Sequence, residues 1–171
     1  MKRFIRLAAV LSAVAGVATA VVAYATAGPP NHANRLEATL QETVQQSLNY
    51  SADYGTRLGI LTGSGTLEGF GAVTSVAGFA ADVSIAACGA GSSTGVRSMR
   101  ITAAEGTLSI RTDEVICVTP QGRVGTGTYE VDGLFSTGVF AGARGSGTFT
   151  NLLVPHIFTI SGKLKLANDE S

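Results

Sequence analysis

Two acidic side chains stand two residues apart in a stretch where polar and apolar residues alternate. Over residues 126–132 this period of two predicts a half-buried strand, with Glu130 and Asp132 on one face and Tyr129 on the other. If the acidic face lines an enclosed site, the two carboxylates, with Arg144 near its mouth, could orient a ligand or act as acid and base. Tyr129, Glu130, Asp132 and Arg144 are therefore the candidate ligand-binding residues.

The opposite orientation of this strand is the simpler alternative. Unpaired carboxylates are costly to bury, so we favour an arrangement in which Tyr129 and Val131 point inward and Glu130 and Asp132 point to water. Arg144 would then be a surface residue that pairs with one of these acids. The face that points inward therefore discriminates between an enzyme and a binding or structural protein.

Other residue types capable of chemistry are sparse. Glu68 is one further polar candidate, but it has no evident catalytic neighbour in the sequence. His32 and His156 have no second ligand at metal-binding spacing, so we predict neither a metal site nor any other cofactor. Ser64 and Ser146 lie between glycines, yet neither occupies the strand–helix turn of a nucleophile elbow. The sequence thus identifies no catalytic residue.

The elements that would position these side chains are short strands. About eight of them, joined by turns roughly every 8–12 residues, suit an all-β sandwich or barrel. The clearest is the last, where Phe158, Ile160 and Leu164 alternate with polar residues. The predicted strands cover residues 57–62, 80–88, 96–104, 107–111, 115–118, 126–132 and 158–166.

Two glycine-rich runs carry a resemblance to a known family. GVFAGARGSGTF at residues 138–149 and GSGTLEGFG at residues 63–71 resemble the strand corners of bacterial exported proteins with an allene oxide cyclase-like barrel, which plant dirigent proteins share. The resemblance implies a single small closed antiparallel barrel, mostly up-and-down, and it covers about residues 62–166. It concerns glycine positions, and the active-site residues of the relatives do not map onto this chain. Residues 133–138 form a longer corner than is usual in that family.

The segment over residues 35–50 is ambiguous. Apolar residues recur every fourth position from Leu36 to Leu48, which favours an amphipathic helix, whereas the β-branched Thr39 and Thr43 favour a strand. Because the resemblance implies a first barrel strand in this region, we expect a strand. Residues 28–56 are then a leader with a first strand, and residues 57–171 are the barrel domain.

The N-terminal residues have the features of an export signal. Lys2, Arg3 and Arg6 precede the apolar run of residues 7–23, and a small-x-small site ends at Ala27. We expect a signal peptide at residues 1–27 and, after its removal, a secreted, periplasmic or cell-envelope protein. The alternative is an uncleaved membrane anchor, since the run approaches the roughly 17-residue minimum for a span.

Composition narrows the choice of partners. The chain has 171 residues, which suits one domain. Cleavage after Ala27 would leave 12 − 3 = 9 basic residues against 12 acidic ones, a net charge of −3. Such a charge argues against nucleic acid or an anionic membrane surface as a partner.

Cys88 and Cys117 are the two cysteines of the chain. In an exported protein a disulfide is the default, with two buried free thiols as the alternative. The expected strand order puts both near the same end of the barrel but two strands apart, about 9.6 Å, which exceeds the roughly 7 Å limit for a bridge. The bond therefore requires the loop at residues 89–95 to fold across the barrel mouth.

Two classes of function are consistent with these features. The first is a non-enzymatic exported barrel that binds a small hydrophobic ligand or acts as a compact structural or interaction module. The second is a cyclase- or dirigent-like enzyme with Glu130, Asp132 or Arg144 in its lumen. Since those relatives assemble as trimers, the resemblance also implies self-association.

Overall fold

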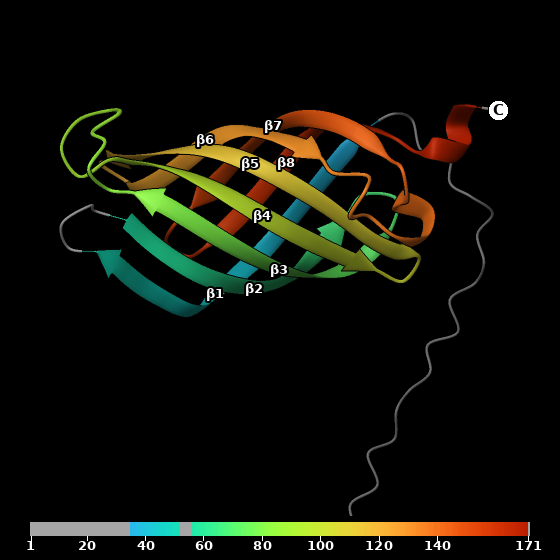
Figure 1. Cartoon of the computed structure of the whole chain (residues 1–171), viewed down its shortest axis with the longest axis horizontal. Coiled ribbons are helices and arrows are strands. Elements are labelled where there is room, and N and C mark those ends of the chain that lie inside the picture. The colour runs from blue at the N-terminus through green and yellow to red at the C-terminus, as the bar shows by residue number, and fades with distance from the viewer. Residues whose placement is uncertain (1–34, 52–55, 171) are drawn as a thin grey trace, which may run out of the picture.

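The described part of the chain forms one closed antiparallel barrel (Figure 1). The computed structural model describes residues 35–51 and 56–170. The expected signal peptide, at residues 1–27, and residues 28–34 and 52–55 of the expected leader lie outside the described residues. Each strand pairs with the next, and the first pairs with the last. The elements are β1 (Leu36–Ser51), β2 (Thr56–Leu67), β3 (Gly71–Asp82), β4 (Ser93–Ala103), β5 (Gly106–Thr119), β6 (Gly122–Val131), η1 (Gly138–Phe140), β7 (Arg144–Leu152), β8 (Ile157–Lys165) and η2 (Ala167–Glu170).

Alternation along each strand decides what points into the lumen. In β4, Met99 and Ile101 are buried while Arg100 and Thr102 are exposed, as the period of two predicts. In β8, Phe158 and Ile160 are likewise inside. The all-β, eight-stranded, closed architecture predicted from the sequence is confirmed.

The ambiguous first segment is a strand that closes the barrel. Ala38 of β1 lies opposite Leu67 of β2 on one side and Ile160 of β8 on the other. A four-residue apolar repeat is also a multiple of two, so Leu36 and Leu40 fit an inward strand face as well as a helix. Buried Ala38 fills the position between these two leucines, which a helical pattern leaves unexplained.

Several glycines expected at corners lie inside strands instead. Residues 63–65 belong to β2 and residues 145–147 to β7. A Cβ at Gly65 would stand 1.9 Å from the backbone oxygen of Thr39, so β1 and β2 approach more closely there than a side chain allows. These glycines therefore permit close packing within continuous strands, and the turns lie elsewhere.

Two predicted strand assignments are wrong. The strand expected at residues 80–88 ends at Asp82, whose carboxylate accepts hydrogen bonds from the backbone and hydroxyl of Ser84 and starts a loop. The runs at 107–111 and 115–118 are one strand, β5, because Thr112 and Glu114 continue its inward face. After β8 the chain forms η2, in which Ala167 and Asn168 are exposed.

The two ends of the barrel differ. At the packed end, the corner over residues 132–143 folds over the lumen, and Phe140 of η1 is fully buried against Phe70 at 4.6 Å between ring centroids. At the open end lie the loop over residues 83–92 and the turn over residues 153–156. Figure 1 shows the packed end at the right and the open end at the left.

Candidate functional site

The lumen contains a cavity at the open end, with a volume of about 280 Å³. Its walls are mainly apolar, and its deeper surface is formed by Arg97 of β4, Glu114 of β5 and Asn151 of β7. Most of a small ligand could be enclosed in such a space, which is at the lower end of ligand-pocket sizes. The apolar walls are Val44, Leu61, Phe79, Ala81, Val83, Ile116 and Leu153.

An ion pair underlies the floor of this cavity. Nη1 of Arg97 donates to both carboxylate oxygens of Glu42, at 3.0 and 2.8 Å, and both side chains are almost fully buried. The guanidinium also lies over the ring of Phe158, 4.7 Å from its centroid. Strands β1, β4 and β8 are therefore tied together across the lumen by one arginine.

A second carboxylate shares this arginine more loosely. Glu114 has its Oε2 3.9 Å from Nη2 of Arg97, and its Oε1 accepts a 2.9 Å hydrogen bond from Nδ2 of Asn151. Gly125 of β6 lies between their strands, and a Cβ there would stand 1.9 Å from Oε1 of Glu114. The glycine thus leaves the space in which Glu114 and Asn151 meet.

Some polar atoms of the floor lack a partner. Oδ1 of Asn151, Nε of Arg97 and Oγ1 of Thr112 are buried without a hydrogen bond in the described structure. Buried polar atoms are nearly always satisfied, and an orphaned one is costly. Of these three atoms, Oδ1 of Asn151 and Nε of Arg97 belong to residues that line the cavity.

Opposing influences act on the pKa of the Glu42 carboxyl. Burial raises the pKa of the Glu42 carboxyl above its ordinary value, and the neighbouring charge of Glu114 adds to the rise. The Arg97 guanidinium, and more weakly His156, lower the same pKa without cancelling the effect of burial. The pKa of Glu42 is therefore raised even though the carboxyl faces a guanidinium.

The rim of the cavity carries basic side chains. Arg57, Arg123 and His156 contribute to its lining. Arg123 reaches across the mouth and donates to the backbone oxygen of Gly91 at 3.2 Å, while the backbone oxygen of His156 accepts from the amide of Glu42 at 2.8 Å. His156 lies in the turn directly before β8 and also borders the cavity.

The loop beside the mouth is covalently fixed. Cys88 and Cys117 form a disulfide with a Cα–Cα distance of 5.7 Å, as predicted. The strands themselves are two apart, and the bond forms because residues 83–92 fold back toward the end of β5, where Ser92 also accepts from the amide of Cys88. A disulfide of this kind is typical of an oxidising, extracytoplasmic setting.

The residues predicted to form a ligand site are not brought together in this cavity. Tyr129 is buried at the packed end, whereas Glu130 is exposed on the outer face opposite Arg111. Asp132 follows the end of β6 and is half-buried, and Arg144 is exposed at the start of β7. The favoured orientation, with Tyr129 inward and the Glu130 carboxylate outward, is confirmed. Glu68 is also exposed, in the turn after β2.

Sequence reasoning missed the polar residues that do face the cavity. Glu42 continues the inward alternation of β1, Arg97 precedes Met99 on the inward face of β4, and Glu114 lies between inward Thr112 and Ile116 on β5. The signal was therefore a charged residue in phase with an apolar face. Asn151 could have been found in the same way, two residues after buried Phe149.

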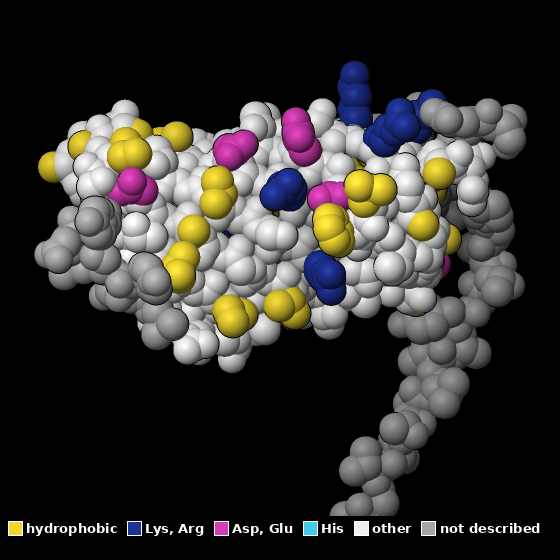
Figure 2. Space-filling model, viewed as in Figure 1, with side chains coloured by type: hydrophobic (Ala, Val, Ile, Leu, Met, Phe, Trp, Pro, Cys, Tyr) yellow, Lys and Arg dark blue, Asp and Glu magenta, His cyan; other side chains and the backbone are white. Residues whose placement is uncertain are grey.

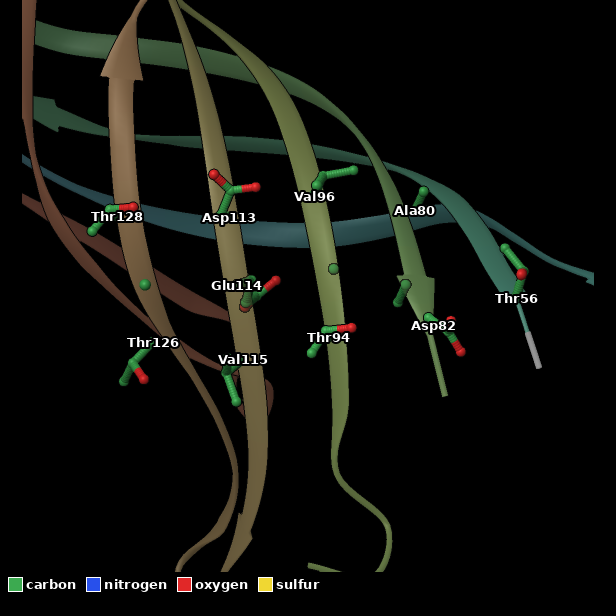
Figure 3. Close-up of a pocket in the computed structure, with 13 residues that line it drawn as sticks. Thr56, Ala80, Asp82, Thr94, Val96, Asp113, Glu114, Val115, Thr126 and Thr128 are labelled. Atoms are coloured by element: carbon green, nitrogen blue, oxygen red, sulfur yellow. The ribbon is translucent and has the colours of Figure 1, made fainter. Parts of the chain in front are cut away.

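A larger hollow lies on the outside of the barrel, with a volume of about 570 Å³. It spreads over β3–β6, where Thr94, Val96, Asp113 and Thr128 project from neighbouring strands (Figure 3). On the surface drawn in Figure 2, hydrophobic side chains are interspersed with acidic and basic ones. This hollow is an open depression without converging buried polar groups, so the enclosed cavity is the better candidate site.

A metal-binding cluster and a membrane-spanning helix are both absent from the described residues. No group of three or more His, Cys, Asp and Glu side chains there is arranged to hold a metal ion. None of the helices in that part of the chain is long and apolar enough to cross a membrane. Comparison of the chain with protein families, with curated proteins and with solved structures finds no match.

Proposed function

We propose that this protein binds a small, mainly apolar molecule in the cavity at the open end of its barrel. The observation that carries the proposal is the partly enclosed volume of about 280 Å³ between apolar walls and a polar floor. An eight-stranded barrel is just wide enough to be filled by side chains or to hold one small ligand. Here side chains fill the packed end, and we propose that the open end holds the ligand.

The proposal also includes a cellular location and a use of the barrel that the family resemblance suggests. An exported protein, released after cleavage near Ala27, is consistent with the disulfide Cys88–Cys117. The glycine pattern that resembles allene oxide cyclase-like and dirigent barrels supports the same general use, since those barrels hold a small molecule. Binding without catalysis is the function we favour, and the resemblance adds a second copy of the chain as a partner.

A cavity-filling substitution tests the proposal. In Ala81→Phe the new ring would occupy the space that Ala81 borders on the inner face of β3. Val96→Phe is the matched control, because Val96 is exposed on the outer face of the neighbouring strand. Native mass spectrometry of protein purified from its expression host, followed by titration with indane, should show ligand on the wild type and Val96→Phe but not on Ala81→Phe. Equal occupancy in Ala81→Phe, or none in the wild type, would contradict the proposal.

Catalysis is the second candidate, and one observation favours it. Glu42, Arg97 and Glu114 converge in the lumen, and burial raises the pKa of Glu42, as is common for a group that transfers protons. In this alternative Glu114, which borders the cavity, acts as acid or base on a bound substrate and Glu42 positions Arg97. Turnover of a bound molecule that stops in Glu114→Gln while binding persists would support the enzyme.

A further inference from the structure

The floor of the open-end cavity has acceptors without donors. Oε2 of Glu114 has its nearest charged neighbour, Nη2 of Arg97, at 3.9 Å, which exceeds hydrogen-bond distance. Oδ1 of Asn151 has no partner, and the amide orientation is fixed because Nδ2 donates to Oε1 of Glu114. Both side chains are more than nine-tenths buried and both border the cavity. A ligand group that donates to both oxygens would satisfy them.

The same floor is short of positive charge. With both carboxylates ionised, Glu42 and Glu114 share the single guanidinium of Arg97, so the local sum is 1 − 2 = −1. The other charges around the cavity, Arg57, Arg123 and His156, lie at its rim. Water screens charges at a rim more effectively than charges in a buried floor. A charged group bound at the floor therefore interacts more strongly with the excess negative charge there than with the charges at the rim.

We propose that the cavity takes a small apolar amine, whose ammonium group donates to Glu114 and Asn151. This inference rests on the proposed function, because it names the ligand class of the same cavity. An ammonium carries three donors, no acceptor and one positive charge, which matches two vacant acceptors and a net charge of −1. The hydrocarbon body would lie between Phe79, Ile116 and Leu153.

Other head groups fit less well. A hydroxyl can donate to one of the two oxygens but leaves the floor with its excess charge. A carboxylate adds a second uncompensated negative charge beside Glu114, and like charges in a buried site are strongly unfavourable. A molecule without a head group leaves both acceptors unsatisfied. The order of affinity should therefore be amine, alcohol, hydrocarbon and carboxylate.

Four probes with the same bicyclic body test this order by calorimetric titration of the folded protein at pH 7. They are 2-aminoindane, 2-indanol, indane and indane-2-carboxylate. We expect 2-aminoindane to bind at least about tenfold more tightly than indane, because a hydrogen bond to a buried charged group contributes more than one between neutral groups. Indane-2-carboxylate should bind most weakly. If indane binds and 2-aminoindane binds no more tightly than indane or 2-indanol, the inference is wrong while the proposed function stands.

Two variants test whether the polar floor residues, and not the apolar walls, produce the preference for the amine. Glu114→Gln removes one negative charge with little change in shape, and it should abolish the preference for 2-aminoindane over indane. Asn151→Leu, which removes the vacant acceptor, should reduce that preference and serves where Glu114→Gln does not fold. A preference that survives in both variants would overturn the assignment. Failure of the wild type to bind either indane or 2-aminoindane would overturn the proposed function and this inference with it.

Discussion

The two ends of the barrel are built from the same eight strands but are filled in opposite ways. At the packed end, large apolar side chains such as Leu36, Leu108 and Phe140 are fully buried, and the corner over residues 132–143 covers them. At the open end, the inward positions hold Arg97, Glu114 and Asn151 among apolar side chains, and a cavity remains. The comparison indicates that the packed end is held by apolar burial, whereas the open end is arranged around buried charged groups.

The polar atoms at the two ends differ as well. The packed end buries the hydroxyl of Tyr129 without a hydrogen bond, and burial raises the pKa of Tyr129 to about 12. Its ring packs where Gly147 and Gly162 leave space, so the residue acts as apolar filling. The open end instead buries three charged groups that interact with one another. Substitutions at the two ends should therefore have different consequences.

The largest effect is expected from Arg97→Met at the open end. Removing the guanidinium leaves Glu42 and Glu114 buried without a cation, and breaking a buried ion pair in this way costs about 3–5 kcal/mol. Urea denaturation measures the loss. Arg100→Met, on the exposed face of the same strand, is the control and should change stability by less than about 0.5 kcal/mol. Similar losses in both variants would show that the buried cluster is energetically unimportant.

Next in size is Gly162→Ala at the packed end. Its Cβ would stand 2.4 Å from the backbone oxygen of Ser146 and 2.4 Å from the hydroxyl of Tyr129, so β7 and β8 must separate. Overpacking of this kind costs about 1–3 kcal/mol, and we expect the upper part of that range because a backbone atom is involved. Thermal unfolding reports it. Gly78→Ala is the control, since a Cβ there meets nothing within 4 Å. Equal stability of the two variants would argue against tight packing at this end.

Removal of the disulfide should affect the open end by a comparable amount. The bond joins residues 29 apart in the sequence, and the double variant Cys88→Ala/Cys117→Ala should lose about 3 kcal/mol in the chain-entropy model. Hydrogen exchange should rise in the loop over residues 83–92 and at the end of β5, with little change near Phe140. Uniformly faster exchange around the whole barrel would contradict the separation of the two ends.

A smaller effect concerns the hydroxyl of Tyr129. Because that hydroxyl is buried without a partner, Tyr129→Phe should leave stability unchanged or raise it by up to about 1 kcal/mol. Chemical denaturation of the two proteins in parallel gives the difference. A clear loss of stability would reveal a hydrogen bond that the described structure does not contain.

The smallest effect is the pH dependence that Glu42 imparts. Its pKa is raised in the folded state, so the folded protein holds this proton more tightly than the unfolded chain, which releases it near the ordinary value of 4.5. The contribution of Glu42 to stability is therefore complete below pH 4.5 and is lost as the pH rises through the folded value. Arg97, Glu114 and His156 are the charged or titratable neighbours that act on this pKa.

Comparison with Glu42→Gln isolates this contribution. The wild type should lose stability relative to the variant as the pH increases above 4.5, whereas exposed groups such as Asp82 affect both proteins equally. Denaturation curves collected at a series of pH values give the difference directly. The opposite slope would show that Arg97 lowers the pKa of Glu42 more than burial raises it.

Much of the packed end was predictable from the sequence. Strict alternation over residues 158–166 and over residues 126–132 determines which side chains point inward, and the structure confirms both patterns. The disulfide was predictable from the oxidising environment expected for an exported chain. The glycine runs indicated a barrel but were assigned to corners, because a sequence does not reveal which glycine faces a neighbouring backbone.

The open end was not predictable in the same way. A charged residue is normally assigned to the solvent face, so Arg97 and Glu114 were not recognised although they are in phase with apolar neighbours. Their burial depends on contacts among four strands, β1, β4, β5 and β7, most of which are far apart in the sequence. It also depends on the space that the missing side chain of Gly125 leaves for Glu114. Only the closed topology brings Glu42, Arg97 and Asn151 into one place, and local periodicity contains no information about it.

Titration of the ¹⁵N-labelled protein with indane, followed by amide chemical shifts, tests the difference between the two ends most directly. The account predicts saturable shifts that cluster around Ser93, Ile116 and Asn151, with Leu36, Ile110 and Tyr129 at the packed end unchanged. Shifts centred on the packed end, shifts confined to the outer face near Val96, or no saturable shifts at all would contradict it.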